Sequence, residues 1–312
     1  MVGRAGQLEP RGSGQMPQIS EREAISHWCE RAAASPSGGP PIATVVIPVF
    51  NHLDETLRCL HAIATTWFET LPVEIVVVDD ASTDRSPEVL MDLPGIVYLR
   101  HNENAGFVRS CNAGAKQARG QYLCFLNNDT VVRKGWLDHL VATAERDARI
   151  GAVGAKLLYP NGRLQEAGGI IWRDGSGCNY GRNADPAEAC YNYERDVDYC
   201  SGAALLVRRA LFEELGGFSE AFAPAYYEDA DLCFTIREAG YRVVYQPKAE
   251  VVHIEGATSG TQLDSGVKRY QRINRPKFEE KWRSQLALHY TNEPRNVALA
   301  ARRLISSPRT LT

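Results

Sequence analysis

Four short apolar runs separated by helix-forming sequence constrain the fold of this chain more than any other feature. The runs stand at 43–49, 74–80, 96–100 and 122–129. Near-continuous apolar runs of this kind are typical of strands in a parallel sheet that helices cover on both faces. The sequence therefore predicts a doubly wound, Rossmann-like α/β half, in which a ligand binds beyond the carboxyl ends of the strands.

The pattern becomes less regular after residue 129. A polar loop rich in Gly and Tyr is expected over 173–197, and a helix is expected to begin near Glu228. Five further strands are expected at 151–159, 168–172, 199–207, 241–247 and 250–254. We interpret this mixed half as the side of the molecule that holds an acceptor.

Both ends of the chain differ from this α/β region. Residues 1–41 are rich in Gly, Pro, Ser and charge and predict a flexible tail, in which Ser20 to Glu23 form a capping box for a short helix through about Ala34. Residues 263–312 are polar, with apolar residues at helical spacing, and predict a helical extension. One catalytic domain is thus expected over residues 42–262.

Composition limits the partners and the compartment. A net charge of −3 without a block of Lys and Arg argues against nucleic acid as a partner. The eight cysteines have neither C-x-x-C spacing nor the density of a disulfide framework, so a reduced, cytoplasmic protein is expected. No apolar run approaches the ~20 residues of a membrane span, so any membrane association is expected to be peripheral, at the inner face.

Acidic residues end two of the predicted strands. Asp79 and Asp80 end the second strand, and Asp129 ends the fourth after two asparagines. Because these ends meet at one edge of the sheet, the carboxylates are expected to converge on one site. Such carboxylates suit Mg²⁺ or Mn²⁺ bound to a diphosphate, since the phosphate oxygens and water complete the shell of the ion. For Asp79 and Asp80 a turn or N-cap role remains an alternative.

A set of ordered motifs then resembles one family. The motifs VVIPVFN, VVVDDAST, HNENAGFVRSCNAG, FLNND, GGF and YYEDADLCFTIREAGY lie between about Ala43 and Gly260. In this order they resemble family 2 glycosyltransferases, and most of all the rhamnosyltransferase-like members. The resemblance implies a GT-A fold over 42–262 and inverting transfer from a UDP- or dTDP-sugar, with dTDP-rhamnose as the first choice. The implied acceptor is a hydroxyl of a glycan or of a lipid-linked glycan in cell-surface polysaccharide synthesis.

The resemblance implies a role for nine residues in binding the nucleotide sugar. Two flank the base and ribose, two contact the base edge and ribose, and the others cover the donor or line the sugar cleft. In chain order these residues are Pro48, Asn51, Asp79, Asp80, Asn104, Gly106, Asn112, Asn128 and Gly202. For Gly106 a helix-start role is the alternative, and for Asn51 a turn role.

The metal site is implied in the same way. Residues 127–129 stand where the family has its Asp-x-Asp motif, with Asn in place of the first acid, so Asp129 is the one carboxylate ligand there. His253 matches a histidine that reaches the metal or the diphosphate, although a structural role at a strand end is equally open. We therefore expect a divalent cofactor, Mg²⁺ or Mn²⁺, on Asp129 and His253.

The catalytic acids are expected at the start of the helix near 228. Acids in the first turn of a helix stabilise it through the helix dipole, whatever the function of the protein. Three acids in four residues are more than this stabilisation requires. The resemblance implies that Asp229 is the base that deprotonates the acceptor, with Glu228 as its neighbour or as an acceptor ligand. Asp231 lies two residues beyond Asp229 and so points elsewhere, and we expect it to cap or hold the helix. Glu228 or Asp196 is the alternative base. Two rival functions are a non-catalytic nucleotide- or glycan-binding module and a sugar-nucleotide pyrophosphorylase, which would need a Gly-rich basic loop that residues 45–55 lack.

Overall fold

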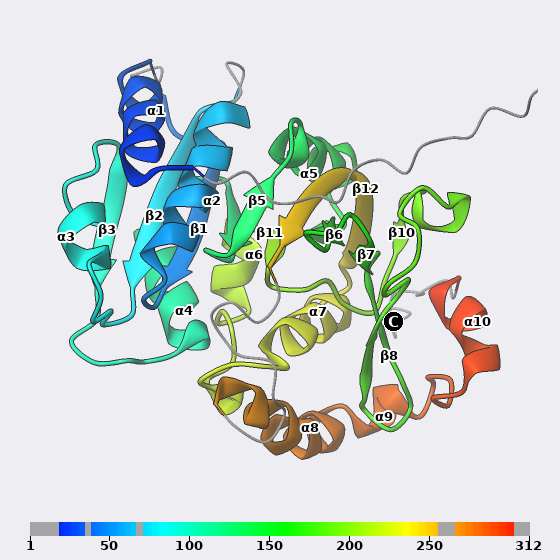
Figure 1. Cartoon of the computed structure of the whole chain (residues 1–312). Coiled ribbons are helices and arrows are strands. Elements are labelled where there is room, and N and C mark those ends of the chain that lie inside the picture. Colours follow the sequence, from blue (N-terminus) through cyan, green and yellow to red (C-terminus); the bar gives the residue numbers. More distant parts are fainter. Residues whose placement is uncertain (1–18, 35–38, 67–70, 255–265, 303–312) are drawn as a thin grey trace, which may run out of the picture.

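The computed structural model describes residues 19–34, 39–66, 71–254 and 266–302 (Figure 1). Its first half contains β1 (Ala43–Val49), β2 (Val73–Asp79), β3 (Ile96–Arg100) and β4 (Tyr122–Leu126). These four strands are parallel, in the order β4-β1-β2-β3. The predicted parallel half is confirmed.

Helices cover both faces of this parallel sheet. Successive side chains of a strand point to opposite faces. Val45 and Ile47 of β1 accordingly pack in the core cluster that contains α2 (Leu53–Thr66), while Val46 packs in the cluster that contains α4 (Phe107–Gln117). The short helix α3 (Ser86–Leu90) follows β2. The apolar runs are buried on both faces, as their composition predicts.

The second half extends the same sheet with strands of mixed direction. β11 (Ala204–Arg208) lies antiparallel between β4 and β6 (Ile150–Leu158), and β12 (Arg242–His253) is parallel to β6. The remaining strands are short: β5 (Thr130–Val132), β7 (Leu164–Glu166), β8 (Gly169–Ile171), β9 (Gly177–Asn179) and β10 (Arg195–Asp196). The helices are α5 (Trp136–Arg146), α6 (Arg209–Glu214) and α7 (Glu228–Glu238). Single 3-10 turns stand at Ala189–Tyr191, Glu220–Phe222, Val267–Arg269 and Pro294–Asn296.

Two expectations about this half need correction. The expected strands 241–247 and 250–254 form one strand, β12, because a register shift between Gln246 and Glu250 lets pairing with β6 resume beyond Pro247. The expected loop 173–197 also contains β9 and β10, whose pairing with β8 and β12 no local pattern shows.

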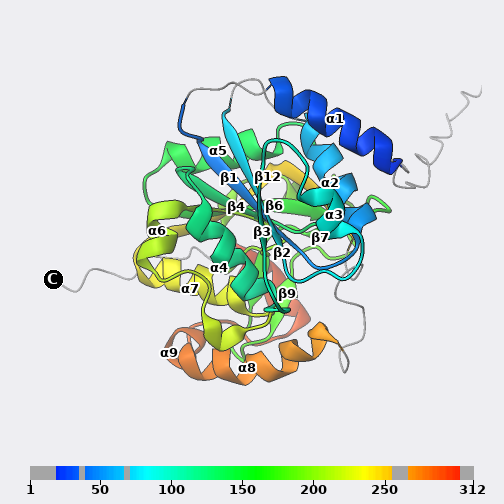
Figure 2. The same cartoon turned by 90° about the vertical axis from the view of Figure 1, so that its left-hand side faces the viewer.

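The helix predicted near the N-terminus is present as α1 (Glu21–Ala34), and the Ser20 Oγ accepts the Glu23 N–H at 3.2 Å, as a capping box requires. Figures 1 and 2 both show α1 beside α2. Ala24 and Trp28 are buried, and the Trp28 indole N–H donates to the Pro94 carbonyl at 2.8 Å. This helix therefore packs on the α/β domain. The rest of the predicted tail, 1–18 and 35–38, lies outside the described residues.

The C-terminal extension is helical and packs against α7. It contains α8 (Tyr270–Lys281), α9 (Arg283–Leu286) and α10 (Val297–Ala301). Figure 1 shows α8 and α9 along the lower edge of the molecule and α10 at its right-hand side. The Asp231 carboxylate of α7 accepts hydrogen bonds from Lys281 Nζ at 2.8 Å and from the Trp282 indole N–H at 2.7 Å. Asp231 is expected to hold its own helix, and through these two bonds it also joins α7 to the C-terminal extension. Each helix in the described residues is too short or too polar to cross a lipid bilayer.

Candidate active site

A cavity of about 860 Å³ lies beyond the carboxyl ends of β1 and β4 and is bounded by α4, α7 and α8. Its wall includes ten of the thirteen residues that the sequence motifs suggest, from both halves of the chain. These ten are Pro48, Asp80, Asn104, Gly106, Asn128, Asp129, Gly202, Glu228, Asp229 and His253. The topology therefore brings most of the predicted site to one place.

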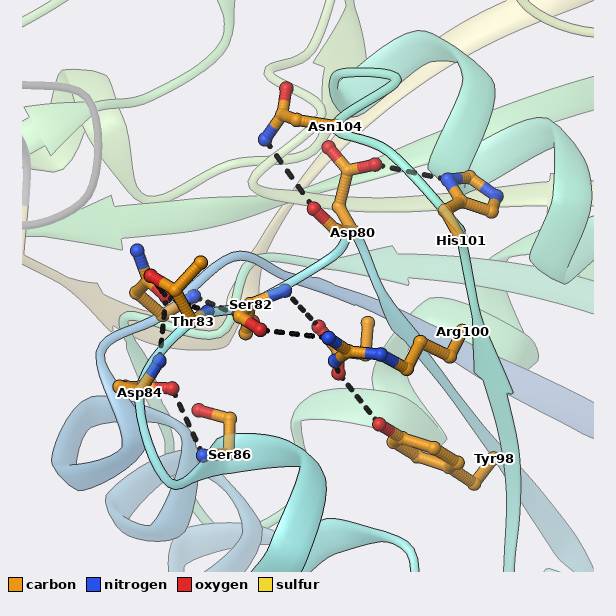
Figure 3. A network of polar contacts seen from close by, with 11 residues as sticks. Asp80, Ser82, Thr83, Asp84, Ser86, Tyr98, Arg100, His101 and Asn104 are labelled. Carbon is orange, nitrogen blue, oxygen red and sulfur yellow. Dashed lines mark hydrogen bonds and ion pairs between the residues drawn. The ribbon is translucent and has the colours of Figure 1, made fainter.

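Asp80 holds the loop that leads into α4 (Figure 3). Its Oδ1 accepts the Ala105 N–H at 2.7 Å and lies 2.9 Å from His101 Nδ1, and its Oδ2 accepts the Gly106 N–H at 2.8 Å. The residue is only 4% exposed. Both oxygens of the carboxylate therefore bind groups of this loop, and a contact between Asp80 and a nucleotide stays a prediction.

Gly106 occupies a position that no other residue fits. Its φ of +85° lies in the left-handed region, and a Cβ there would stand 2.3 Å from the Cβ of Pro224. The residue is also the N-cap of α4, so the helix-start role is present. Asn104, which precedes it by two residues, lines the cavity and donates to the Asp80 carbonyl at 3.4 Å.

Three predicted donor-binding residues lie outside the cavity wall, and their side chains bind protein groups. Asp79 is fully buried, where it accepts the Ser82 N–H at 2.8 Å and the Tyr98 hydroxyl at 2.6 Å. Asn51 Oδ1 accepts backbone N–H groups of the turn at Thr83 and Asp84, so the turn role is the one seen.

Asn112 is the third. Its amide pairs with both backbone groups of Phe218, at 2.8 and 2.9 Å, and so ties α4 to the GGF segment. The structure thus shows these three side chains bound to protein groups outside the cavity wall, and their contact with a donor stays a prediction.

Asp129 and His253 meet because β5 pairs with the end of β12. This pairing sets Thr130 opposite His253, and the Ile254 N–H donates to the Asp129 carbonyl at 2.9 Å. The Asp129 Oδ1 then lies 3.3 Å from His253 Nε2. On the other side of the ring, Nδ1 lies 3.0 Å from Gln165 Oε1, which fixes the orientation of the ring, and Asn127 Nδ2 lies 3.3 Å from Nε2.

This corner fits a divalent cation. Two adjacent ligands of an octahedral ion at ~2.1 Å stand about 3 Å apart, close to the 3.3 Å separation of Oδ1 and Nε2. The nearby Asn127 Oδ1 is buried and accepts no hydrogen bond from the described residues. Those residues hold no group of three or more His, Cys, Asp or Glu for a metal, so the phosphate of a ligand would have to complete the shell.

The start of α7 carries the candidate base. Asp229 is half-buried in the cavity wall, where its Oδ2 accepts the Gly202 N–H at 3.1 Å and its Oδ1 accepts the Ala230 N–H at 2.7 Å. Burial raises the pKa of Asp229 above its ordinary value, which makes the carboxylate a stronger base. The preceding Tyr226 and Tyr227 both have φ of +73°, a strained backbone of the kind that collects at functional sites.

Glu228 is more enclosed than its neighbour. It is 6% exposed, and its Oε2 has no hydrogen-bond partner among the described residues. Burial, followed by the nearby Asp229 carboxylate, raises the pKa of Glu228 well above its ordinary value. The alternative base Asp196 forms an ion pair with Arg242 at 2.8 Å and lies outside the cavity wall. Of these acids, Asp229 is therefore the best placed to accept a proton.

The cavity wall also contains residues that the sequence motifs do not suggest. Glu166 of β7 is a buried acid, and Lys268 and Arg272 come from the C-terminal extension. Glu166 stands within a segment of mostly small and apolar residues, 164–171, and this is the one sequence signal that points to it as a site residue. No local pattern indicates that the extension returns to the cavity, because this depends on the packing of α8 against α7.

Comparisons with known proteins agree with this geometry. The profile described as glycosyl transferase family 2 matches residues 44–216. The chain is 30% identical over 299 residues to the uncharacterized protein y4gI of Sinorhizobium fredii, covering 88% of this chain and 31% of that protein. It is 29% identical over 243 residues to the N-acetylglucosaminyl-diphospho-decaprenol L-rhamnosyltransferase of Mycobacterium tuberculosis, covering 70% of this chain and 77% of that enzyme. The chain thus spans about a third of the length of the first relative.

A solved structure supports the fold. The crystal structure of GalNAc-T7 with UDP, GalNAc and Mn²⁺ superposes with a TM-score of 0.65 at 18% identity, covering 79% of this chain and 50% of that one. The GT-A fold implied by the motifs is thereby confirmed. Since the family profile covers more than half of the chain, from β1 to the end of α6, this protein belongs to glycosyl transferase family 2.

Proposed function

We propose that this protein is an inverting glycosyltransferase that moves a sugar from a nucleoside diphosphate donor to an acceptor hydroxyl. The observation that carries the proposal is the position of Asp229, a half-buried carboxylate that faces the same cavity as Asp129 and His253. A base on one wall and a pair of metal ligands on another are the two groups that a single displacement needs.

Asp229 would remove the proton of the acceptor hydroxyl as the oxygen attacks the sugar carbon. Its two backbone hydrogen bonds fix the carboxylate toward the cavity, and its raised pKa increases its affinity for that proton. Gly202, which donates one of these bonds, leaves little room, because an added Cβ would stand 3.3 Å from the Phe107 ring. The geometry thus supports both the basicity and the orientation of Asp229.

Asp129 and His253 would hold Mg²⁺ or Mn²⁺, with Asn127 nearby. When bound, the ion would neutralise the charge that develops on the leaving diphosphate. The GalNAc-T7 structure was solved with UDP and Mn²⁺, and the facing Asp129 and His253 atoms favour the same kind of cofactor here.

The donor and acceptor are proposed from one relative. The Mycobacterium tuberculosis enzyme is named as an L-rhamnosyltransferase that acts on N-acetylglucosaminyl-diphospho-decaprenol. We therefore propose dTDP-rhamnose as the first donor to test, with other UDP- and dTDP-sugars after it, and a lipid-linked glycan as the acceptor. Residues 42–262 would form the catalytic domain, and residues 263–312 would complete its acceptor side.

The test is a donor screen. The purified chain is incubated with dTDP-rhamnose, UDP-glucose and UDP-N-acetylglucosamine, each with N-acetylglucosaminyl-diphospho-decaprenol and Mn²⁺, and the release of nucleoside diphosphate is measured. We expect release with one class of donor and a product of inverted anomeric configuration by NMR. Retained configuration would contradict the single displacement. A lack of release with every pair would favour a non-catalytic binding module.

A further inference from the structure

Glu166 is a buried acid of the cavity that the proposed mechanism does not use. It ends β7 opposite Leu157 of β6, is 1% exposed, and lines the cavity. Its Oε1 accepts the Ser201 N–H at 3.1 Å. The next N–H along the chain, that of Gly202, donates to Asp229 at the same distance of 3.1 Å. The successive backbone N–H groups of Ser201 and Gly202 thus bind the carboxyl groups of Glu166 and Asp229.

The two carboxyl groups do not receive equal support. Asp229 accepts two backbone hydrogen bonds, whereas Glu166 accepts one in the described part of the chain. Because hydrogen bonds from N–H groups favour the ionised form of a carboxyl group, Asp229 is the one that ionises more readily. When two acids share a low-dielectric site in this way, the less supported acid keeps its proton and can act as a donor.

Among the residues that the structure describes, the positive charge that acts on Glu166 is that of Arg195. Arg195 is the nearby cation, but its guanidinium lies over the rings of Tyr180 and Tyr245 and donates to the Ala167 carbonyl, with no ion pair to Glu166. The other titratable groups near Glu166 are neutral in their ordinary state. They are Tyr199, Tyr245, Cys178, Cys200 and Cys233.

We propose that Glu166 binds the acceptor sugar as a neutral carboxylic acid, donating a hydrogen bond to an acceptor oxygen beside the hydroxyl that Asp229 deprotonates. This inference rests on the proposed function, and it assigns the acceptor side of the cavity to the β7 segment. It agrees with the environment of the carboxyl group, since burial, with the Asp229 charge as a smaller cause, raises the pKa of Glu166 to about 8.

Two variants of Glu166 separate hydrogen-bond donation from charge. Glu166→Gln keeps a donor of the same shape and cannot ionise, whereas Glu166→Leu removes the donor. With the transfer assay above, we expect kcat/KM for the acceptor at pH 7 to fall less in Glu166→Gln than in Glu166→Leu, because the amide can still donate a hydrogen bond. In Glu166→Leu we expect it to fall by about 5–10-fold, the worth of one hydrogen bond, mainly through KM. Equal kcat/KM in Glu166→Leu and wild type would overturn the proposal.

The pH profile provides the sharper readout. Wild-type kcat/KM should fall as the pH rises through about 8, where Glu166 loses its proton, and the fall should be absent in Glu166→Gln. An unchanged alkaline fall in Glu166→Gln would overturn the proposal. Asp229→Asn serves as the reference for the mechanism itself. If Asp229→Asn is inactive while both Glu166 variants behave as wild type, the inference about Glu166 fails and the proposed function stands.

Thermal melting tests the protonation without any substrate. A carboxyl group whose pKa is raised in the folded state contributes stability at low pH and loses it as the pH rises. For Glu166 the loss should begin near the ordinary Glu value of 4.5 and be complete above about 8. The melting temperature of wild type should therefore fall relative to that of Glu166→Gln over this range. A constant difference between the two proteins would show an ionised Glu166 and overturn the proposal.

Discussion

Replacing Asp80 by Ala tests whether this carboxylate builds the loop over the cavity. The substitution removes the acceptor of the Ala105 and Gly106 N–H groups and the partner of His101. An N–H group left without a partner costs about 1 kcal/mol where water can still reach it, and the two groups here are half-buried. We therefore expect Asp80→Ala to lower the free energy of unfolding by roughly 2 kcal/mol, or the melting temperature by about 4 °C.

Donor affinity should fall in the same variant, because Asn104 and Gly106 line the cavity from this loop. Thermal melts and calorimetric titration of UDP or dTDP with Mn²⁺ measure the two effects. Asp92→Ala, which removes an exposed carboxylate of the turn after α3, is the matched control and should change neither. A variant that melts like wild type but binds nucleotide weakly would refute the loop argument, and it would indicate that Asp80 contacts the nucleotide directly.

Three further predictions concern the proposed metal ligand His253, the buried acid Glu228 and the contact of Asp231 with the C-terminal helices. His253→Ala should weaken the affinity for UDP or dTDP in Mn²⁺ toward the value measured in chelator, and equal affinities with and without metal in wild type would remove the metal assignment. Glu228→Gln should melt above wild type at pH 8 and close to it at pH 4, because stability is lost as the pH rises from 4.5 toward the raised pKa of Glu228. Asp231→Ala should cost about 2–4 kcal/mol of unfolding free energy, since the buried Trp282 N–H loses its acceptor, and a denaturant titration with an unchanged midpoint would contradict this.

The parts of the fold that the sequence predicts well are those with a local cause. The apolar runs of β1, β2 and β4 are buried on both faces, so their composition alone indicates a parallel sheet. The start of α1 is predicted for the same reason, because Ser20 directly precedes the helix and accepts the N–H of Glu23, three residues further on. Such elements depend on residues that are close together in the sequence, so a local sequence pattern is enough to predict them.

The parts that it predicts poorly depend on contacts between distant segments. Asp80 stands at a strand end as expected, but its carboxylate turns toward the loop at 101–106, a direction that spacing does not reveal. The pairing of β5 with β12, which sets Asp129 beside His253, joins residues more than a hundred positions apart. Glu166 escapes notice because an acid in a strand normally faces water, and only the packing around β7 shows that this one is buried.

The most direct test of the proposed mechanism is the transfer rate of Asp229→Asn. The amide keeps the size of the side chain and can still accept a hydrogen bond from the Gly202 N–H, but it does not accept a proton at neutral pH. A general base typically contributes about 10²–10⁴-fold, so kcat at saturating donor and acceptor should fall by that factor while the affinity for donor changes little. Turnover close to wild type in Asp229→Asn would contradict the assignment of Asp229 as the base.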